Sequence, residues 1–173
     1  MDDQTSASTV ERKTSAAAPV LDRAGSMNED MGGGQTRIQG LREAAQIFVD
    51  VMLQDDGVSL EAAQELKPVT VLGSPADPFY PGRSTIKASI TGPDLNPAGQ
   101  TSIGDGIVKG RTALNASAGF DYKSLLVFTD GKENHAPFIA DVAAQLNERT
   151  YAVGLGTPQN ISAAGLQTVA AIS

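Results

Sequence analysis

Four residues with oxygen-bearing side chains lie in three separated segments of the sequence: Asp22 and Ser26, then Thr101, then Asp130. Carboxylates and hydroxyls are hard ligands, which suit Mg²⁺, Mn²⁺ or Ca²⁺ rather than zinc. The chain contains no cysteine, which excludes a thiolate zinc site and a cysteine nucleophile. If folding brings the three segments together, these residues could form a divalent cation site.

Two of these residues follow stretches that predict strands. Asp22 ends a short apolar stretch that starts near residue 17, although Pro19 within it removes a hydrogen-bond donor. Asp130 lies in the run 124–131, whose continuous apolar residues are typical of a strand buried on both faces of a parallel sheet. Further strands are expected over 56–60, 66–73 and 150–156, with residues 61–65 as a short link.

Helices are predicted between these strands. Apolar residues recur at helical spacing over 36–53, and Thr36 with Gln39 forms a capping box at the start. Thr101 comes just before a second helical segment that extends to residue 114. Shorter helices are expected over 84–90, 138–147 and 161–172.

The alternation of strands and helices predicts an α/β fold, with a doubly wound, mostly parallel central sheet and helices on both of its faces. In such folds, ligands bind in the crevice beyond the carboxyl ends of the strands. Asp22 and Asp130 both follow strand ends. The predicted fold therefore places both carboxylates at the expected binding edge.

The length and composition of the chain limit its organisation. Its 173 residues suit one domain. Residues 1–16 are rich in Ser, Thr and charged groups, which predicts a disordered polar tail. Residues 17–173 are expected to form the domain, and we expect it to be incomplete at the C-terminus because the sequence ends within a helical pattern.

The charge of the chain narrows the classes of partner. A net charge of −7 disfavours nucleic acid and anionic membranes as partners. The sequence shows neither the order of a secretion signal nor an apolar run long enough to span a membrane. The compartment and the oligomeric state remain open.

Three motifs, in this order and spacing, resemble the parts of a von Willebrand factor type A (vWA) domain with a metal-ion-dependent adhesion site. They are "LDRAGSM" (21–27), "GQTSIGDGI" (99–107) and "LLVFTDGKEN" (125–134), and the resemblance covers about residues 19–170. It implies that Ser26 and Thr101 bind Mg²⁺ (or Mn²⁺ or Ca²⁺) directly, while Asp22 and Asp130 act through water. It further implies that an acidic group of a partner protein completes the coordination.

One position departs from the pattern of this family. The family begins its first motif with Asp-x-Ser-x-Ser, but Ala24 replaces the first serine here. A methyl group cannot bind a cation, and Mg²⁺ demands near-ideal octahedral geometry. The sequence therefore leaves open whether water fills this place or cation binding is weakened or lost.

Other polar residues near the motifs have ordinary structural interpretations as well. Asp105, Glu133 and Asn134 are candidates for a partner-binding rim around the cation. Asp105 could instead complement the dipole of the second helix, with Ser102 as its cap, and Glu133 and Asn134 could be solvated loop residues.

Three functions are compatible with these motifs. The first is a non-enzymatic module for adhesion or assembly that binds a partner carboxylate through the cation. The second is a metal-free scaffold of the same fold that binds through its loops, such as 74–83 and 92–100. The third is a metal-dependent phosphatase or phosphotransferase with Asp22 as nucleophile, which is disfavoured because Ala24 occupies the place of a second carboxylate. Members of the family often belong to surface or secreted proteins.

Overall fold

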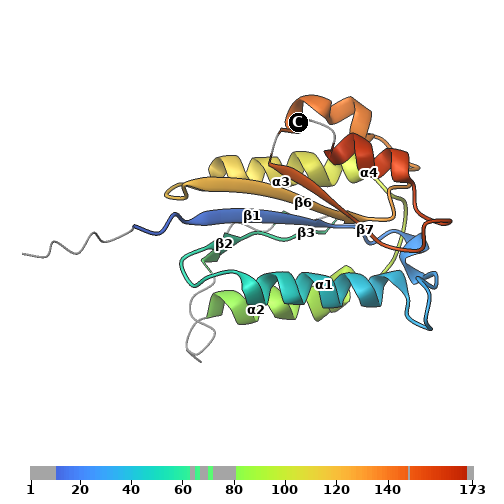
Figure 1. Cartoon of the computed structure of the whole chain (residues 1–173), viewed down its shortest axis with the longest axis horizontal. Helices are drawn as coiled ribbons and strands as arrows, with labels where there is room; N and C mark the ends of the chain where they lie inside the picture. Colours follow the sequence, from blue (N-terminus) through green and yellow to red (C-terminus); the bar gives the residue numbers. More distant parts are fainter. Residues whose placement is uncertain (1–10, 63–64, 67–69, 72–80, 148, 171–173) are drawn as a thin grey trace, which may run out of the picture.

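The computed structural model describes residues 11–62, 65–66, 70–71, 81–147 and 149–170, and the side chains of 61–81 are left undescribed. A central sheet lies between two layers of helices (Figure 1). The strands are β1 (Ser15–Leu21), β2 (Gly57–Val58), β3 (Glu61–Ala62), β4 (Glu65–Leu66), β5 (Thr70–Val71), β6 (Tyr122–Thr129) and β7 (Thr150–Gly154). The α-helices are α1 (Arg37–Val51), α2 (Pro81–Thr91), α3 (Ile103–Ala116) and α4 (Ala163–Ala170), and the 3-10 helices are η1 (Gly25–Asn28), η2 (Pro93–Leu95) and η3 (Ile139–Gln145).

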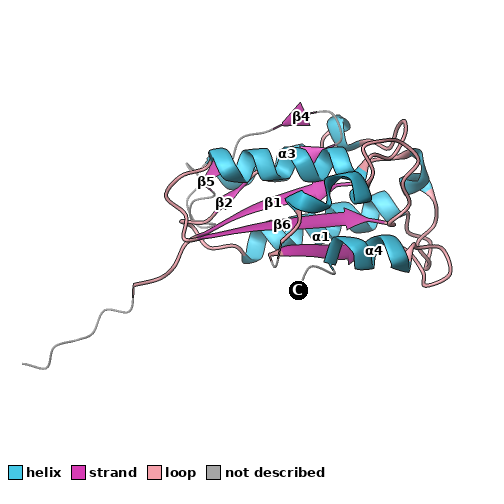
Figure 2. Ribbon diagram, turned by 90° about the horizontal axis from the view of Figure 1, so that it is seen from above, coloured by secondary structure: helices cyan, strands magenta, loops and turns pink. Residues whose placement is uncertain are grey.

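The order of the strands confirms the predicted doubly wound sheet. β1 lies at its centre and pairs in parallel with β6, which in turn pairs in parallel with β7. Figure 2 shows β1 and β6 side by side. On the other side, β2 and β3 pair in parallel with successive parts of β1, and β5 and β4 extend them as antiparallel strands. The helices α1 and α2 cover one face, and α3 and α4 cover the other (Figure 1).

Pro19 lies in the central strand, where a missing backbone donor would normally break the ladder. The partner of β1 is interrupted at this point, because β2 pairs with residues 16–17 and β3 pairs with residues 20–21. Ser59, in the gap between β2 and β3, donates its N–H to the carbonyl of Ala17. Because the backbone groups of alternate residues point to the same side of a strand, those of Pro19 point to this side as well. The backbone nitrogen of Pro19, which has no hydrogen to donate, therefore faces a gap in the ladder, where a proline is tolerated.

The core has two layers of mainly aliphatic side chains, one on each face of the sheet. The layer under α1 and α2 includes Leu41, Val49, Ile90 and Phe128. The layer under α3 includes Val20, Ile107, Leu114 and Leu125. This arrangement fits the amphipathic spacing of the helices, since each helix turns its apolar stripe toward the sheet.

The boundaries of several elements differ from the sequence-based expectations. The expected tail, 1–16, overlaps the fold, because Ser15 and Ala16 belong to β1 and residues 1–10 lie outside the described part. The expected link at 61–65 contains β3, and the expected strand at 66–73 is replaced by short pieces, partly outside the described residues. The helix expected over 138–147 is a 3-10 helix with a kink at Val142, whose backbone is not helical.

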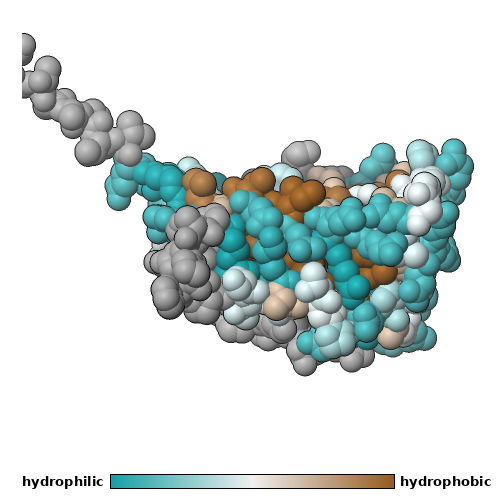
Figure 3. All heavy atoms as spheres, turned by 90° about the horizontal axis from the view of Figure 1, so that it is seen from below, coloured by the Kyte–Doolittle hydropathy of each residue, from teal (hydrophilic) through white to brown (hydrophobic). Residues whose placement is uncertain are grey.

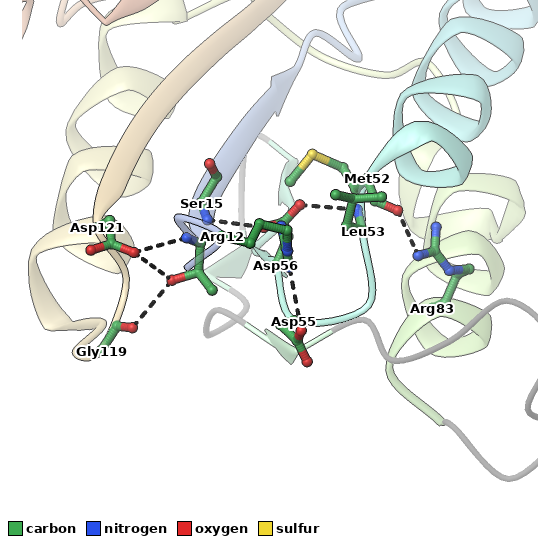
Figure 4. Close-up of polar contacts among 10 residues, drawn as sticks. Arg12, Ser15, Met52, Leu53, Asp55, Asp56, Arg83, Gly119 and Asp121 are labelled. Atoms are coloured by element: carbon green, nitrogen blue, oxygen red, sulfur yellow. Dashed lines mark hydrogen bonds and ion pairs between the residues drawn. The ribbon is translucent and has the colours of Figure 1, made fainter. Parts of the chain in front are cut away.

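A polar cluster anchors the beginning of β1 at the end of the sheet opposite the site (Figure 4). The buried carboxylate of Asp56 accepts hydrogen bonds from Ser15 N at 2.9 Å, Leu53 N at 2.9 Å and Arg12 Nη1 at 3.1 Å. Asp121 accepts from Thr14 N at 2.8 Å. The residues before β1 are therefore bonded to the loops on both sides of the strand.

The outer face of α1 is mixed in character. Figure 3 shows the molecule from below, with apolar atoms exposed among polar side chains. The exposed large apolar residues at α1 and just after it are Ile47, Val51 and Leu53. Among the described helices, none has the length and apolar character needed to cross a membrane.

Candidate metal and partner-binding site

The ends of β1 and β6 place Asp22 next to the motif of Asp130. In the register of these strands Leu21 faces Phe128, and Asp22 N donates to Phe128 O at 3.0 Å. The side chain of Asp22 then accepts from Thr129 Oγ1 at 2.7 Å and from Ala24 N at 2.9 Å. Each carboxylate oxygen of Asp22 thus has one hydrogen bond within the fold.

Backbone bonds bring the second motif to the same edge. Gly25 N donates to Gly99 O at 3.3 Å, and Ala98 N donates to Arg23 O at 2.7 Å. These two bonds join the loop after β1 to the loop before α3. The loop before α3 is therefore fixed beside Asp22.

Asn134, from the third motif, bonds to both backbone groups of Thr101. The side-chain Oδ1 of Asn134 accepts from Thr101 N at 2.8 Å, and its backbone N–H donates to Thr101 O at 3.1 Å. His135 N also donates to Thr101 O at 3.0 Å. The second and third motifs are therefore directly bonded to each other.

The three segments enclose a small cavity. Asp22, Thr101 and Thr129 line a space of about 20 Å³ between the strand ends and the start of α3. This volume suits a single water-sized occupant. Beside it lies an open crevice of about 360 Å³, lined among others by Arg23, Ser102, Asp105 and His135.

The two hydroxyl groups of the expected site are available. Within the described part of the chain, neither Ser26 Oγ nor Thr101 Oγ1 makes a hydrogen bond. Ser26 is partly buried in η1, and Thr101 is 5% exposed. The small cavity is lined by Thr101 and Asp22 but not by Ser26 or Asp130. Hydroxyls and carboxylates are oxygen donors of the kind that a hard divalent cation binds.

Asp130 has a partner, Arg37, that no local sequence pattern predicts. It is fully buried, and its Oδ2 lies 2.8 Å from Nη1 of Arg37, which is also fully buried. The other oxygen, Oδ1, accepts from Lys132 N at 3.0 Å. Arg37 Nη1 also donates to Ser26 O at 3.2 Å, which joins the first and third motifs.

The residues proposed for a partner-binding rim have defined contacts within the fold. The half-buried carboxylate of Glu133 accepts from Gly104 N at 3.2 Å and from Ile139 N at 2.8 Å, so it joins the starts of α3 and η3. Burial raises the pKa of Glu133, which these backbone bonds partly oppose. Asp105, in the first turn of α3, pairs with Lys109 at 2.7 Å. The structure thus gives Glu133 a role inside the fold, and the predicted rim contacts stay predictions.

The composition of the site limits how it could hold a cation. Ala24 is buried at the edge of this site and offers no oxygen. Among the described residues, no three His, Cys, Asp or Glu side chains cluster closely enough to hold a metal. A cation would therefore depend on hydroxyls and water as well as the carboxylates, which fits the expected ligands Ser26 and Thr101.

Burial has a direct effect on the acidity of Asp22. Desolvation raises its pKa above the usual 3.8, the charge of Asp130 adds to this, and the bonds from Thr129 and Ala24 oppose it. Between the unfolded and the raised folded pKa, the native state binds more protons than the unfolded state. The contribution of Asp22 to stability therefore falls as the pH rises through this window.

This leads to a prediction for Asp22→Asn, which cannot ionise but keeps an oxygen that can accept from Ala24 N. We expect the stability of the variant relative to the parent to increase as the pH rises from about 3 to 7, because only the parent must bury a charge. Urea titrations across this range would measure the difference. A difference that stays constant with pH, or that shrinks toward pH 7, would contradict a raised pKa at Asp22.

Comparison with known proteins shows which known type of fold this chain has. No protein-family model matches the sequence, and no curated protein is significantly similar to it. A von Willebrand factor type A structure from Catenulispora acidiphila superposes with a TM-score of 0.64 at 17% identity, over 94% of this chain and 37% of that one. This chain has a vWA-like fold.

Two further structures show the same vWA-like architecture. An aerotolerance-related membrane protein from Bacteroides fragilis NCTC 9343, solved with multiple mutations to serines, has a TM-score of 0.66 at 16% identity, over 92% of this chain and 87% of that one. The PilB minor pilin of Streptococcus sanguinis has a TM-score of 0.52 at 26% identity, over 70% of this chain and 30% of that one. The predicted vWA-like fold is confirmed, and this chain spans only about a third of the pilin.

Proposed function

We propose that this chain is a non-enzymatic protein-binding module of the vWA type, acting in adhesion or assembly. It binds an acidic group of a partner protein through a divalent cation, Mg²⁺ or else Mn²⁺ or Ca²⁺, at the crevice beyond β1 and β6. The observation that carries this proposal is the small cavity that Asp22 and Thr101 line together at one edge of the sheet, with the hydroxyl of Thr101 unbonded among the described residues. Ser26, on the loop after β1, offers a second unbonded hydroxyl. Similarity to a minor pilin supports a role in protein binding.

The residues of the site have distinct roles in this proposal. Ser26 and Thr101 bind the cation directly, and Asp22 and Asp130 orient water molecules around it. A bound cation supplies a coordination place for a carboxylate of the partner. The open crevice beside the site, lined by Arg23 and His135, accommodates the rest of the partner segment.

Catalysis is less compatible with the same site. A phosphatase that used Asp22 as nucleophile would need a general acid or base at position 24, and Ala24 cannot serve. The two oxygens of Asp22 already accept hydrogen bonds from the fold. The second candidate function is therefore partner binding through the loops without a metal ion. It is favoured by Ala24, which lacks the hydroxyl that the family pattern has at this position.

Ala24→Ser is expected to increase the affinity for Mg²⁺ about tenfold, because it restores the hydroxyl that the family pattern has at this position. Calorimetric titration of the parent and the variant would measure the change. Ser26→Ala serves as the matched control and is expected to weaken binding, since it removes a direct ligand. If Ala24→Ser binds Mg²⁺ no more tightly than the parent, the assignment of Ala24 to a ligand position is wrong.

The partner is tested by the effect of a chelator. A partner protein that binds to the immobilised chain in the presence of Mg²⁺ should be released by EDTA. The same partner should not bind to the immobilised Ser26→Ala variant. Capture that is equal in Mg²⁺ and in EDTA would support metal-free binding instead.

A further inference from the structure

Arg37 occupies an unusual place in the fold. It is the first residue of α1, and its side chain is fully buried. Its guanidinium contacts four residues from three segments: Nη1 lies 2.8 Å from Asp130 and 3.2 Å from Ser26 O, while Nη2 lies 2.9 Å from Glu29 and 3.4 Å from Asn160 O. Arg37 therefore joins the loops that follow β1, β6 and β7, two of which carry the first and third motifs.

This place is unfavourable for a positive charge unless something compensates it. The N-terminus of a helix carries a partial positive charge, which repels a cation in the first turn. Removing a guanidinium from water also costs free energy, and Arg37 Nε has no hydrogen-bond partner among the described residues. The compensation comes from Asp130, which is equally buried, and from the more exposed Glu29.

The site contains two carboxylates close enough to influence each other. The charge of Asp130 raises the pKa of Asp22, whereas the charge of Arg37 lowers it, both acting in addition to the larger effect of burial. Without a positive group, two like charges would be buried together at the strand ends. Either a bound cation or Arg37 can relieve this repulsion, and Arg37 is part of the chain.

We propose that the guanidinium of Arg37 neutralises Asp130 in place of a metal ion. It holds the loops of the site in position whether or not Mg²⁺ is bound. The inference deepens the proposed function and rests on it for the identity of the cation site. One carboxylate of the site is permanently compensated, so the attraction for Mg²⁺ is weakened. Ala24 acts in the same direction, because it removes an oxygen ligand.

Arg37→Met tests the proposal, because methionine fills much of the same space without a charge. In EDTA the melting temperature of the variant should fall by about 10 °C, since Asp130 is left as an unpaired buried charge. Saturating Mg²⁺ should restore roughly half of this loss or more and should bind about tenfold more tightly than to the parent. The melting temperature of the parent should rise less between EDTA and Mg²⁺ than that of Arg37→Met, because the parent binds Mg²⁺ more weakly and has no unpaired buried charge to relieve.

Two controls separate charge from shape. The double variant Arg37→Met/Asp130→Asn removes both charges. Mg²⁺ should therefore raise its melting temperature less than it raises that of Arg37→Met. Arg37→Lys keeps the charge but not the planar set of donors, so it should bind Mg²⁺ as weakly as the parent even where its melting temperature falls. If Arg37→Met does not fold in EDTA, the Mg²⁺ affinity of Arg37→Lys decides the question.

The inference is overturned if Mg²⁺ does not restore stability to Arg37→Met, or if Arg37→Lys binds Mg²⁺ about tenfold more tightly than the parent. The proposed function fails on a different result, namely that Ala24→Ser with Arg37 intact shows no Mg²⁺-dependent binding of a partner. The two failures can therefore be told apart.

Discussion

Asp130→Ala is expected to lower the free energy of unfolding by about 3–5 kcal/mol, because it leaves the buried guanidinium of Arg37 with only the exposed carboxylate of Glu29 as a counter-charge. The side chains of Asp130 and Arg37 are both fully buried, so water cannot readily take the place of the lost carboxylate. Arg37 also loses its bond to the loop after β6, while the bond from Nη1 to Ser26 O does not involve Asp130. Urea titration followed by circular dichroism would measure the loss.

Asp105→Ala is the matched control for this variant. Asp105 also forms an ion pair at the same edge of the sheet, but both partners are partly exposed, with Lys109 28% and Asp105 34% accessible. Its loss should cost at most about 1 kcal/mol. If Asp130→Ala costs no more than Asp105→Ala, the buried pair contributes little to the fold.

Gly104→Ala is expected to destabilise the protein by about 2–3 kcal/mol, although alanine is the better helix former by about 1 kcal/mol. A Cβ at Gly104 would collide with the carbonyl oxygen of Pro137 and would lie 2.6 Å from that of Phe138. These are backbone atoms, which cannot rotate away, so α3 or the loop before η3 must move. Thermal unfolding would measure the effect.

Gly40→Ala provides the matched comparison in α1. A Cβ at Gly40 meets the end of the Met31 side chain, with Cε at 3.0 Å. A flexible thioether can move aside, so the gain in helix propensity should prevail and the stability should stay equal or rise by up to about 1 kcal/mol. If both variants were stabilised, the tight packing of α3 against residues 137–138 would be contradicted.

The sequence predicted the parts of the fold that local patterns determine. The capping box of Thr36 and Gln39 marked the start of α1, and both of its hydrogen bonds are present. The apolar runs at 124–131 and 150–156 correspond to β6 and β7. The three motifs marked the loops that meet at one edge of the sheet, because parallel strands end on the same side.

The parts that escaped prediction depend on contacts between distant residues. Arg37 lies 93 positions from Asp130, and nothing local indicates that a polar residue at the start of a helix will be buried. A basic residue in a first helical turn was the only available signal, since the helix dipole disfavours it there. Glu133 similarly looked like a free loop residue, because its acceptor role depends on the starts of α3 and η3 coming together.

The attachment of the residues before β1 has a mechanical consequence. Arg12 and Thr14 are bonded at one end of the strand, and Asp22 lies just beyond the other end. β1 therefore runs the length of the sheet from the anchored segment to the candidate site (Figure 1). A pull between a bound partner and a tether before Arg12 would travel along this strand, and its pairing with β6 would resist the load in shear rather than by peeling.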